Sequence, residues 1–440
     1  MSSSLLSPAQ KLPADLIELF LDFVGDDRET LLNFSKVLPA WRNAALPRMF
    51  RCITLDSESG SMILRFPKEF TMEYLVKRVE ITGRNSSGSS LDPAFHHLLK
   101  CLTRLETVKF TRCDFSYLRF TQTAESRSHF EEFTLALCRP SVQVVILEQT
   151  RYVPLPLLAA CPNFKRLEAM NGNKFVDYVP QYVPKQEPSN MQMETIHVGG
   201  VYNIGCLGRW LGEMPKGCRF SKLRSIHISD AGYADEAVPL KIGKLLEVTG
   251  VSLEELNLTL RLGPETKLNI SSSYFKPLER LKRLTVDLSL SMASSRHGIS
   301  LQLANAGIGS FVRSLPTLEC LEHFKLVHRV YVKSNEPVQL FVDALMPLFE
   351  KVDFALGYHS LRSLGEMEVQ AHVLNPSVEV CPFLFPHWMF TGFPQLLTVL
   401  TIGPTLVLKP LQLTYLIILG QRVLHCSTQL TWPVIIPQSE

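Results

Sequence analysis

The segment near the N-terminus has more apolar residues than one amphipathic helix can bury on a single face. Pro13 suits the first turn of a helix because its missing N–H is not needed there. Asp15 and Glu18 place negative charge near the positive end of the helix dipole, and Gly25 predicts the helix end. The apolar residues between them are Leu16, Ile17, Leu19, Phe20, Leu21, Phe23 and Val24. They cover more than the single stripe of a surface helix.

Two further short helices are predicted before residue 50. Asp26, with Glu29 three residues later, matches a capping box that opens the second helix, and Pro39 suits the start of the third. The apolar residues of these helices include Leu31, Leu32, Phe34, Val37, Trp41, Ala44, Ala45 and Leu46. So short a bundle rarely folds without a metal, a disulfide or a partner. Its surplus apolar surface therefore packs on the rest of the chain or binds another protein.

After Phe50 the pattern changes to apolar-x-x-apolar-x-apolar, which recurs along the chain. The segments begin at Val76, Leu105, Val142, Phe164, Met193, Leu223, Leu253, Leu281, Leu321 and Leu396, with a weaker one near Leu364. Neighbours are mostly about 28 to 30 residues apart, and about 40 or more toward the C-terminus. One such strand cannot bury its apolar face alone, so adjacent units are expected to stack into a parallel sheet. Helical returns are predicted at Asp92–Leu102 and Ala237–Gly250.

The composition is that of a globular protein with a large core. The chain has 440 residues, of which 46% are hydrophobic and 20% charged. The 45 Lys and Arg residues against 42 Asp and Glu leave a formal charge of +3, and no basic block occurs. This balance argues against a nucleic-acid partner and against an anionic membrane surface.

Cysteine usage and the termini indicate an intracellular location. The ten cysteines are dispersed with no C-x-x-C pair, so reduced and mostly buried thiols are expected. No signal peptide is recognised at the N-terminus, and no span of about 18 apolar residues predicts a membrane helix. We therefore expect a soluble protein that is cytoplasmic, nuclear or both.

Residues 11–50 resemble an F-box. The motif elements are Leu12-Pro13, Asp15, the apolar run from Leu16 to Val24, and then Val37 with Trp41-Arg42. In one departure, Leu38-Pro39 stands where the family often has a small or Cys residue followed by a basic one. The resemblance implies docking on a Skp-family adaptor within an SCF-type cullin–RING ubiquitin ligase. The adaptor-binding candidates are Leu12, Pro13, Leu16, Ile17, Phe20, Leu31, Leu32, Val37 and Trp41, of which the last four are divided between that surface and internal packing.

The recurring segments resemble the leucine-rich repeat, in which each unit supplies one strand and a helical or irregular return. The best unit is LETVKFTRC, from Leu105 to Cys113, where Cys113 takes the position at which Asn or Cys satisfies loop backbone groups. Most other units lose that position. The predicted fold is therefore α/β, with an F-box at 11–50, an irregular leucine-rich-repeat solenoid at 51–405 and a C-terminal cap or tail at 406–440.

No catalytic, cofactor or metal site is predicted. The chain lacks G-x-S-x-G, the P-loop, G-x-G-x-x-G and H-E-x-x-H. The glycine-rich GGVYNIGCLG from Gly199 is interpreted as a turn after a strand. His197 and His227 occupy the exposed position of two repeat strands, and they would be neighbours if the repeats stack in register. The same position elsewhere holds Glu80, Lys109, Ile146, Glu168, Asn257, Thr285 and Lys325, a mixed row that suits protein recognition.

Together these features predict a non-enzymatic substrate-recognition subunit whose repeat domain binds an unknown target protein. One alternative is a repeat scaffold with no link to ubiquitination, in which the N-terminal helices cap the repeats. A parallel β-helix acting on polysaccharide is disfavoured, because no clustered Asp, Arg or Lys on one sheet face and no secretion signal is found.

Overall fold

The computed structural model describes residues 12–25, 27–56, 75–83, 101–116, 137–155, 158, 161, 163–169, 172–176, 192–213, 222–229, 237–262, 278–291, 320–331, 366–374, 412–419 and 422–429. The chain forms two compact units, Met1–Met191 and Gln192–Glu440. The predicted strand Leu396–Ile402 and most of the predicted helix Asp92–Leu102 lie outside the described residues. The domain ranges 11–50, 51–405 and 406–440 stay predictions.

The first unit opens with three helices, α1 (Ala14–Val24), α2 (Arg28–Val37) and α3 (Pro39–Met49). Gly25 ends α1 as predicted, with φ +63° and its N–H donating to the Leu21 carbonyl. The predicted cap at Asp26 is wrong. α2 begins one residue later than a capping box from Asp26 requires, so Asp27 is the N-cap and its carboxylate accepts from the Glu29 N–H. Pro39 opens α3 as predicted.

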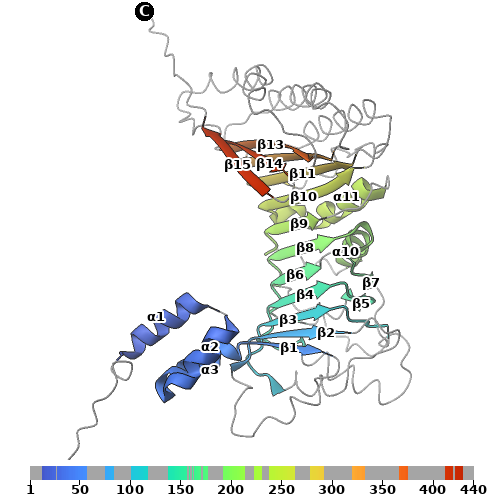
Figure 1. The fold of residues 1–440 in the computed structure, drawn as a ribbon. Helices are drawn as coiled ribbons and strands as arrows, with labels where there is room; N and C mark the ends of the chain where they lie inside the picture. The colour runs from blue at the N-terminus through green and yellow to red at the C-terminus, as the bar shows by residue number, and fades with distance from the viewer. Residues whose placement is uncertain are drawn as a thin grey trace, which may run out of the picture. The chain divides into compact units, whose positions relative to one another are not determined.

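The strands of the first unit are parallel and follow one another in chain order (Figure 1). They are β1 (Cys52–Asp56), β2 (Arg78–Thr82), β3 (Thr107–Thr111), β4 (Val144–Glu148) and β6 (Arg166–Ala169). Two short strands, β5 (Val153–Pro154) and β7 (Phe175–Val176), pair separately. Sequence reasoning missed β1, although Phe50, Ile53 and Leu55 carry the same apolar spacing as the other units.

The second unit repeats this arrangement, and its later strands are eight or nine residues long. Its parallel strands, also in chain order, are β8 (Thr195–Gly199), β9 (Ser225–Ser229), β10 (Glu255–Leu262), β11 (Arg283–Ser291), β12 (His323–Tyr331) and β13 (Glu366–Leu374). An antiparallel pair, β14 (Gln412–Leu419) and β15 (Arg422–Gln429), forms a separate two-stranded sheet inside the predicted C-terminal segment.

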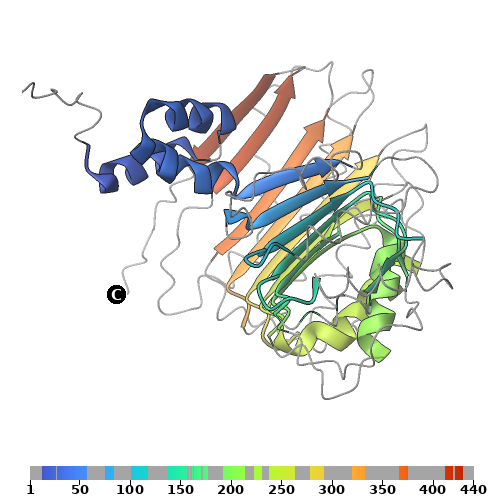
Figure 2. The same ribbon diagram turned by 90° about the horizontal axis from the view of Figure 1, so that it is seen from below.

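Two helices of the second unit lie side by side, α10 (Val201–Glu213) and α11 (Ala237–Thr249), the latter followed by a 3₁₀ turn, η3 (Gly250–Ser252) (Figure 2). α11 confirms the predicted helix Ala237–Gly250. The interpretation of the segment from Gly199 as a turn is wrong beyond Gly200. Gly200, with φ +83°, makes the turn, and the amphipathic residues after it continue as α10. The two remaining glycines of that segment, Gly205 and Gly208, do not stop the helix, because its apolar face is buried.

Parallel stacking of the predicted repeat strands is confirmed within each unit. Paired residues are 22 positions apart between β4 and β6 and 43 apart between β12 and β13, the same steps as from Val142 to Phe164 and from Leu321 to Leu364 in the apolar pattern. Burial alternates along the strands, as in β2, β3, β4 and β9. One side of each of these four strands therefore faces an apolar core and the other side stays half-buried.

Polar side chains at the strand ends satisfy the backbone of the turns. The Cys113 thiol donates to the carbonyls of Ile81 and Thr111, at 3.6 and 3.5 Å, which confirms the role predicted for it. Burial raises the pKa of Cys113 to about 12, so this thiol keeps its proton and remains a donor. Buried Asn173 accepts from the Thr150 N–H and donates to the Leu147 carbonyl. These bonds supply partners for turn groups that would otherwise be buried unpaired.

Candidate functional site

Helix α1 buries one face and exposes a second apolar face. Ile17 and Leu21 are 4% and 0% exposed and lie in the core of the three helices. On the outer face, Leu16 is 42%, Leu19 65%, Phe20 49% and Phe23 93% exposed. Their spacing of three and four residues places them together along the helix. The surplus of apolar residues inferred from the sequence is therefore an exposed surface, which we call the α1 outer face (Leu16, Leu19, Phe20 and Phe23).

Trp41 sits at the centre of the small core behind that surface. Its ring stacks on Phe34 at 4.8 Å between centroids and meets Phe20 at 6.3 Å. Leu31 and Ala45 complete this core at 1% and 0% exposure. Phe20 thus joins the outer face to the core, and the half-exposed ring is held in a fixed position by Trp41.

An ion pair holds α1 to α3. The Arg48 guanidinium on α3 contacts Glu18 at 2.8 Å and Asp22 at 2.7 Å, two carboxylates that lie one turn apart on α1. Such surface pairs contribute modestly to stability, although one guanidinium shared between two carboxylates fixes geometry better than an isolated pair. The ion pair therefore links α3 to the side of α1 that carries Glu18 and Asp22.

The structure divides the nine predicted adaptor-binding residues between core and surface. Buried in the three-helix core are Ile17, Leu31 and Trp41, and Leu12 is half-buried. Exposed are Pro13, Leu16, Phe20, Leu32 and Val37. Sequence reasoning left out two exposed residues, Leu19 and Phe23, which follow Leu16 at positions three and seven along the same helical face.

The strand face opposite the core forms a second candidate surface. In the first unit, the predicted row Glu80, Lys109, Ile146 and Glu168 is in register across β2, β3, β4 and β6. Its charges are paired within the face: Arg78 to Glu80 at 2.6 Å, Lys109 to Glu148 at 3.0 Å and Arg166 to Glu168 at 2.6 Å.

The uncharged part of this face lies on β4. Val144 and Ile146 point to the same side as the charged row and are half-buried. They leave an apolar strip bordered by compensated charges. An apolar centre with a polar rim is the usual anatomy of a protein-binding patch.

In the second unit the same row carries two imidazoles. His197 and His227 are paired in register, with ring centroids 5.1 Å apart, as the sequence predicted for stacked repeats. The row continues through Asn257, Thr285 and Lys325 on the next strands. Burial lowers the pKa of His227, although the charges of Glu255 and Asp287 oppose this shift. Neutral imidazole both donates and accepts hydrogen bonds, so this face offers mixed polar contacts without a strong charge.

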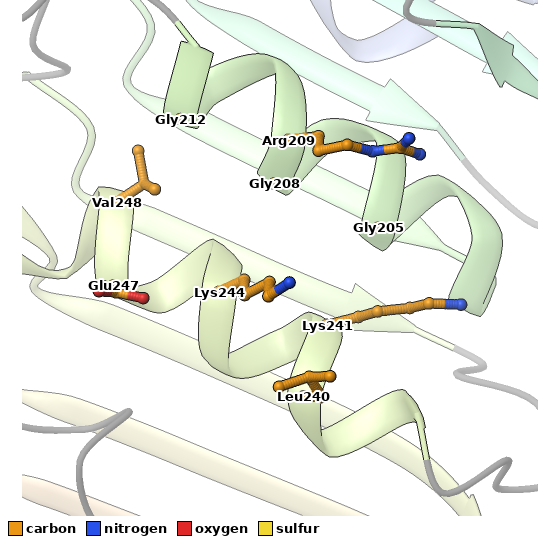
Figure 3. A pocket seen from close by; sticks show the side chains of 9 residues that line it. All are labelled: Gly205, Gly208, Arg209, Gly212, Leu240, Lys241, Lys244, Glu247 and Val248. Atoms are coloured by element: carbon orange, nitrogen blue, oxygen red, sulfur yellow. The ribbon is translucent and has the colours of Figure 1, made fainter.

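A groove of about 470 Å³ runs between α10 and α11 (Figure 3). Gly205, Gly208 and Gly212 of α10 line it, and a Cβ on Gly208 would stand 3.4 Å from the Leu245 backbone nitrogen of α11. The charged side chains along it are Arg209, Lys241, Lys244 and Glu247. This surplus of cations gives the groove a positive rim, which attracts anionic groups.

The described residues hold neither a cluster of metal-binding side chains nor a membrane-spanning helix. No three His, Cys, Asp or Glu side chains gather there in a way that could hold a metal ion. No helix of that part of the chain is long and apolar enough to cross a membrane.

Comparison with known proteins identifies no family for the chain. No protein-family model matches it, and no curated protein matches it. Among solved structures, an internalin (inlF) from Listeria monocytogenes str. 4b F2365 is similar, with 13% sequence identity and a TM-score of 0.26 over 82% of this chain and 92% of that chain. A TM-score this low supports no argument about function.

Proposed function

We propose that this protein is the substrate-recognition subunit of an SCF-type cullin–RING ubiquitin ligase. In this proposal α1–α3 form an F-box that docks on a Skp-family adaptor, and the repeat strands bind a target protein of unknown identity. The chain itself performs no catalysis. It holds the target near the ubiquitin-loaded enzyme, and this tethering turns a bimolecular encounter into a nearly intramolecular one.

The α1 outer face carries this proposal. Its four large apolar side chains are between 42% and 93% exposed, while the core that supports them is already complete. Exposing such a patch is unfavourable in water, so its presence favours a protein partner. The patch lies in the segment whose ordered motif resembles an F-box, from Leu12-Pro13 to Trp41-Arg42. The agreement between the motif and the exposed apolar surface supports adaptor docking.

The strand faces are the proposed target-binding surface. One part of this surface is the apolar strip of Val144 and Ile146 on the first unit. The other part is the imidazole pair of His197 and His227 on the second unit. Rigid strands hold both sets in fixed positions, which lowers the entropy lost when a partner binds.

The test is co-purification of the full chain with a Skp-type adaptor. In the test variant, Leu16, Leu19 and Phe23 are changed to Ser. These side chains are 42%, 65% and 93% exposed, so we expect the fold to tolerate the change. Phe20 is kept because its ring meets Trp41 in the core. Ile17 is left intact because it is 4% exposed and supports the core. We expect the wild type to bind and the triple variant to lose at least about tenfold in affinity, or about 1.4 kcal/mol.

A matched control removes exposed apolar side chains from the second unit. Leu240, Val248 and Val251 are 44%, 38% and 68% exposed in the second unit, and their change to Ser is expected to leave adaptor binding intact. Equal loss in both triple variants would indicate non-specific apolar adhesion. A folded wild type that does not bind the adaptor would overturn the ligase proposal.

The second candidate is an interaction scaffold without a link to ubiquitination. It is favoured by the paired charges around Val144 and Ile146, because that patch needs no adaptor to bind a protein. It would also explain the departure of Leu38-Pro39 from the F-box pattern. The adaptor experiment distinguishes the two candidates, because a scaffold does not bind the adaptor. Changing the α1 outer face of a scaffold also leaves its binding to the target intact.

A further inference from the structure

Two cysteines from neighbouring repeats of the first unit bring their sulfurs close together. The Sγ atoms of Cys138 and Cys161 are 3.9 Å apart. Cys138 precedes β4 and Cys161 precedes β6, the strand that pairs with it. They are 23 positions apart in the chain, so stacking of the repeats brings them together.

The surrounding backbone holds this approach in place. The Asn163 side-chain amide donates to the Pro140 carbonyl at 2.7 Å, between the same two turns. The N–H groups of Lys165 and Arg166 both donate to the Gln143 carbonyl, at 2.8 and 3.0 Å. Closure shortens the Sγ–Sγ distance from 3.9 Å to about 2.05 Å, the length of a disulfide bond.

The two thiols differ in a way that suits them to successive roles. Cys161 is fully buried, whereas Cys138 is half-buried and reaches solvent. The hydrogen bond from Cys161 lowers the pKa of Cys138, and the same pair raises the pKa of Cys161. Cys138 is therefore the sulfur that an external oxidant reaches first, and its thiolate form is favoured over that of Cys161. Cys113 contrasts with both, because its thiol donates to backbone carbonyls.

We propose that Cys138 and Cys161 form a redox-modification site that closes reversibly into a disulfide when a peroxide is present. The Cys138 thiolate attacks one oxygen of hydrogen peroxide, the O–O bond breaks, and the departing hydroxide takes a proton to become water. This leaves Cys138 as a sulfenic acid. The Cys161 sulfur then attacks the Cys138 sulfur, the S–O bond breaks, and the leaving hydroxide takes the Cys161 proton to become a second water. A dithiol reverses the reaction by thiol–disulfide exchange and is itself oxidised.

Closure would tie the turn before β4 to the turn before β6. These are the turns that lead into Val144 and Ile146 on one side and Glu168 on the other. Oxidation therefore constrains two adjacent strands of the candidate target-binding face. The inference does not depend on the ligase proposal, since it concerns only the stacking of the repeats.

The experiment oxidises the folded full chain with a small excess of hydrogen peroxide. Catalase removes the remainder, the chain is then unfolded in urea with N-ethylmaleimide so that buried free thiols are also blocked, and mass spectrometry with peptide mapping locates any disulfide. We expect two fewer labelled thiols than the ten that the reduced chain offers, with the loss assigned to a Cys138–Cys161 link. Dithiothreitol restores the full number.

Variants distinguish this pairing from general oxidation. C138S and C161S each lose the disulfide, whereas C320S, which removes an exposed cysteine, keeps it. Urea unfolding of each variant checks that it is folded. Oxidation of Cys138 to sulfinic acid without a link to Cys161 would overturn the proposal, as would pairing of Cys138 with a different cysteine. Equal formation of the disulfide in the urea-unfolded chain would also overturn the proposal, because the folded geometry would then not favour the link.

Discussion

The repeat strands bury their apolar residues, whereas the first N-terminal helix exposes several of its own. In β3, Val108 and Phe110 are 0% and 1% exposed, while on α1 Phe23 is 93% exposed. The strand has an apolar neighbour on each side that repeats its pattern, whereas α1 has only two short helices to pack against. An apolar run that exceeds the available core becomes a surface, and its exposure identifies the region where a partner is expected.

The largest expected effect on stability tests this comparison by changing one phenylalanine in each region. Phe110→Ala removes a buried ring that packs edge-on against Phe115 at 5.3 Å, so we expect the free energy of unfolding to fall by about 3 to 5 kcal/mol. Phe23→Ala removes an exposed ring and should change it by less than about 0.5 kcal/mol.

Urea unfolding followed by circular dichroism measures both variants. Similar losses from the two substitutions would mean that Phe23 is covered within the chain. The α1 outer face would then not be free for an adaptor.

A smaller effect tests how tightly the repeats stack compared with a helix. A Cβ on Gly83 would stand 2.6 Å from the backbone carbonyl oxygen of Arg112, an atom that cannot move away without disturbing the turn after β3. We expect Gly83→Ala to cost about 1 to 3 kcal/mol of stability.

Gly205→Ala is the matched control in α10. Its Cβ would meet the Lys241 side chain at 3.1 Å, and that flexible chain can move aside while alanine improves helix propensity. We expect no loss of thermal stability there. A tolerated Gly83→Ala would contradict the close approach between the repeats.

The smallest expected effect concerns pH and the imidazole pair. Burial lowers the pKa of His227 below its ordinary value of 6.5. Between about pH 7 and pH 5 the unfolded chain therefore binds a proton that the folded chain resists, so stability falls as the pH falls through this window and is unaffected above it. His227→Gln should flatten this part of the pH dependence.

The comparison is between urea midpoints at about pH 7.5 and about pH 5.5 for the wild type and for His227→Gln. An equally steep decline in the variant would show that other groups cause the loss. His197, whose ring lies 5.1 Å away, is kept unchanged so that only one imidazole is tested.

Most of the strand positions could be predicted because each repeat carries its own local signal. The apolar spacing located β2, β3, β4, β6 and β8 through β12 from their first apolar residues, and Cys113 was predicted to satisfy loop backbone groups. β1 was missed because its pattern begins inside the preceding helical segment, at Phe50. α10 was missed because the glycine-rich stretch from Gly199 to Gly208 resembles a turn, and only packing against α11 shows that Gly205 and Gly208 are contact positions.

The candidate site was harder to predict than the fold. The sequence identified an apolar excess on residues 12–24 but could not divide it. Ile17 and Leu16 are adjacent and chemically alike, yet one is 4% exposed and the other 42%. Which of them faces the core depends on where α3 lies, which Trp41 and Arg48 fix through contacts distant in sequence.

The sequence alone determined the repeat period, the helix boundaries at Gly25 and Pro39 and the presence of surplus apolar surface, because these depend on local spacing and backbone preference. The tertiary structure alone decided which apolar residues form the α1 outer face and which cysteines meet. The approach of Cys138 to Cys161 at 3.9 Å is a consequence of stacking two repeats of unequal length. Such contacts arise between segments whose separation in sequence no local pattern specifies.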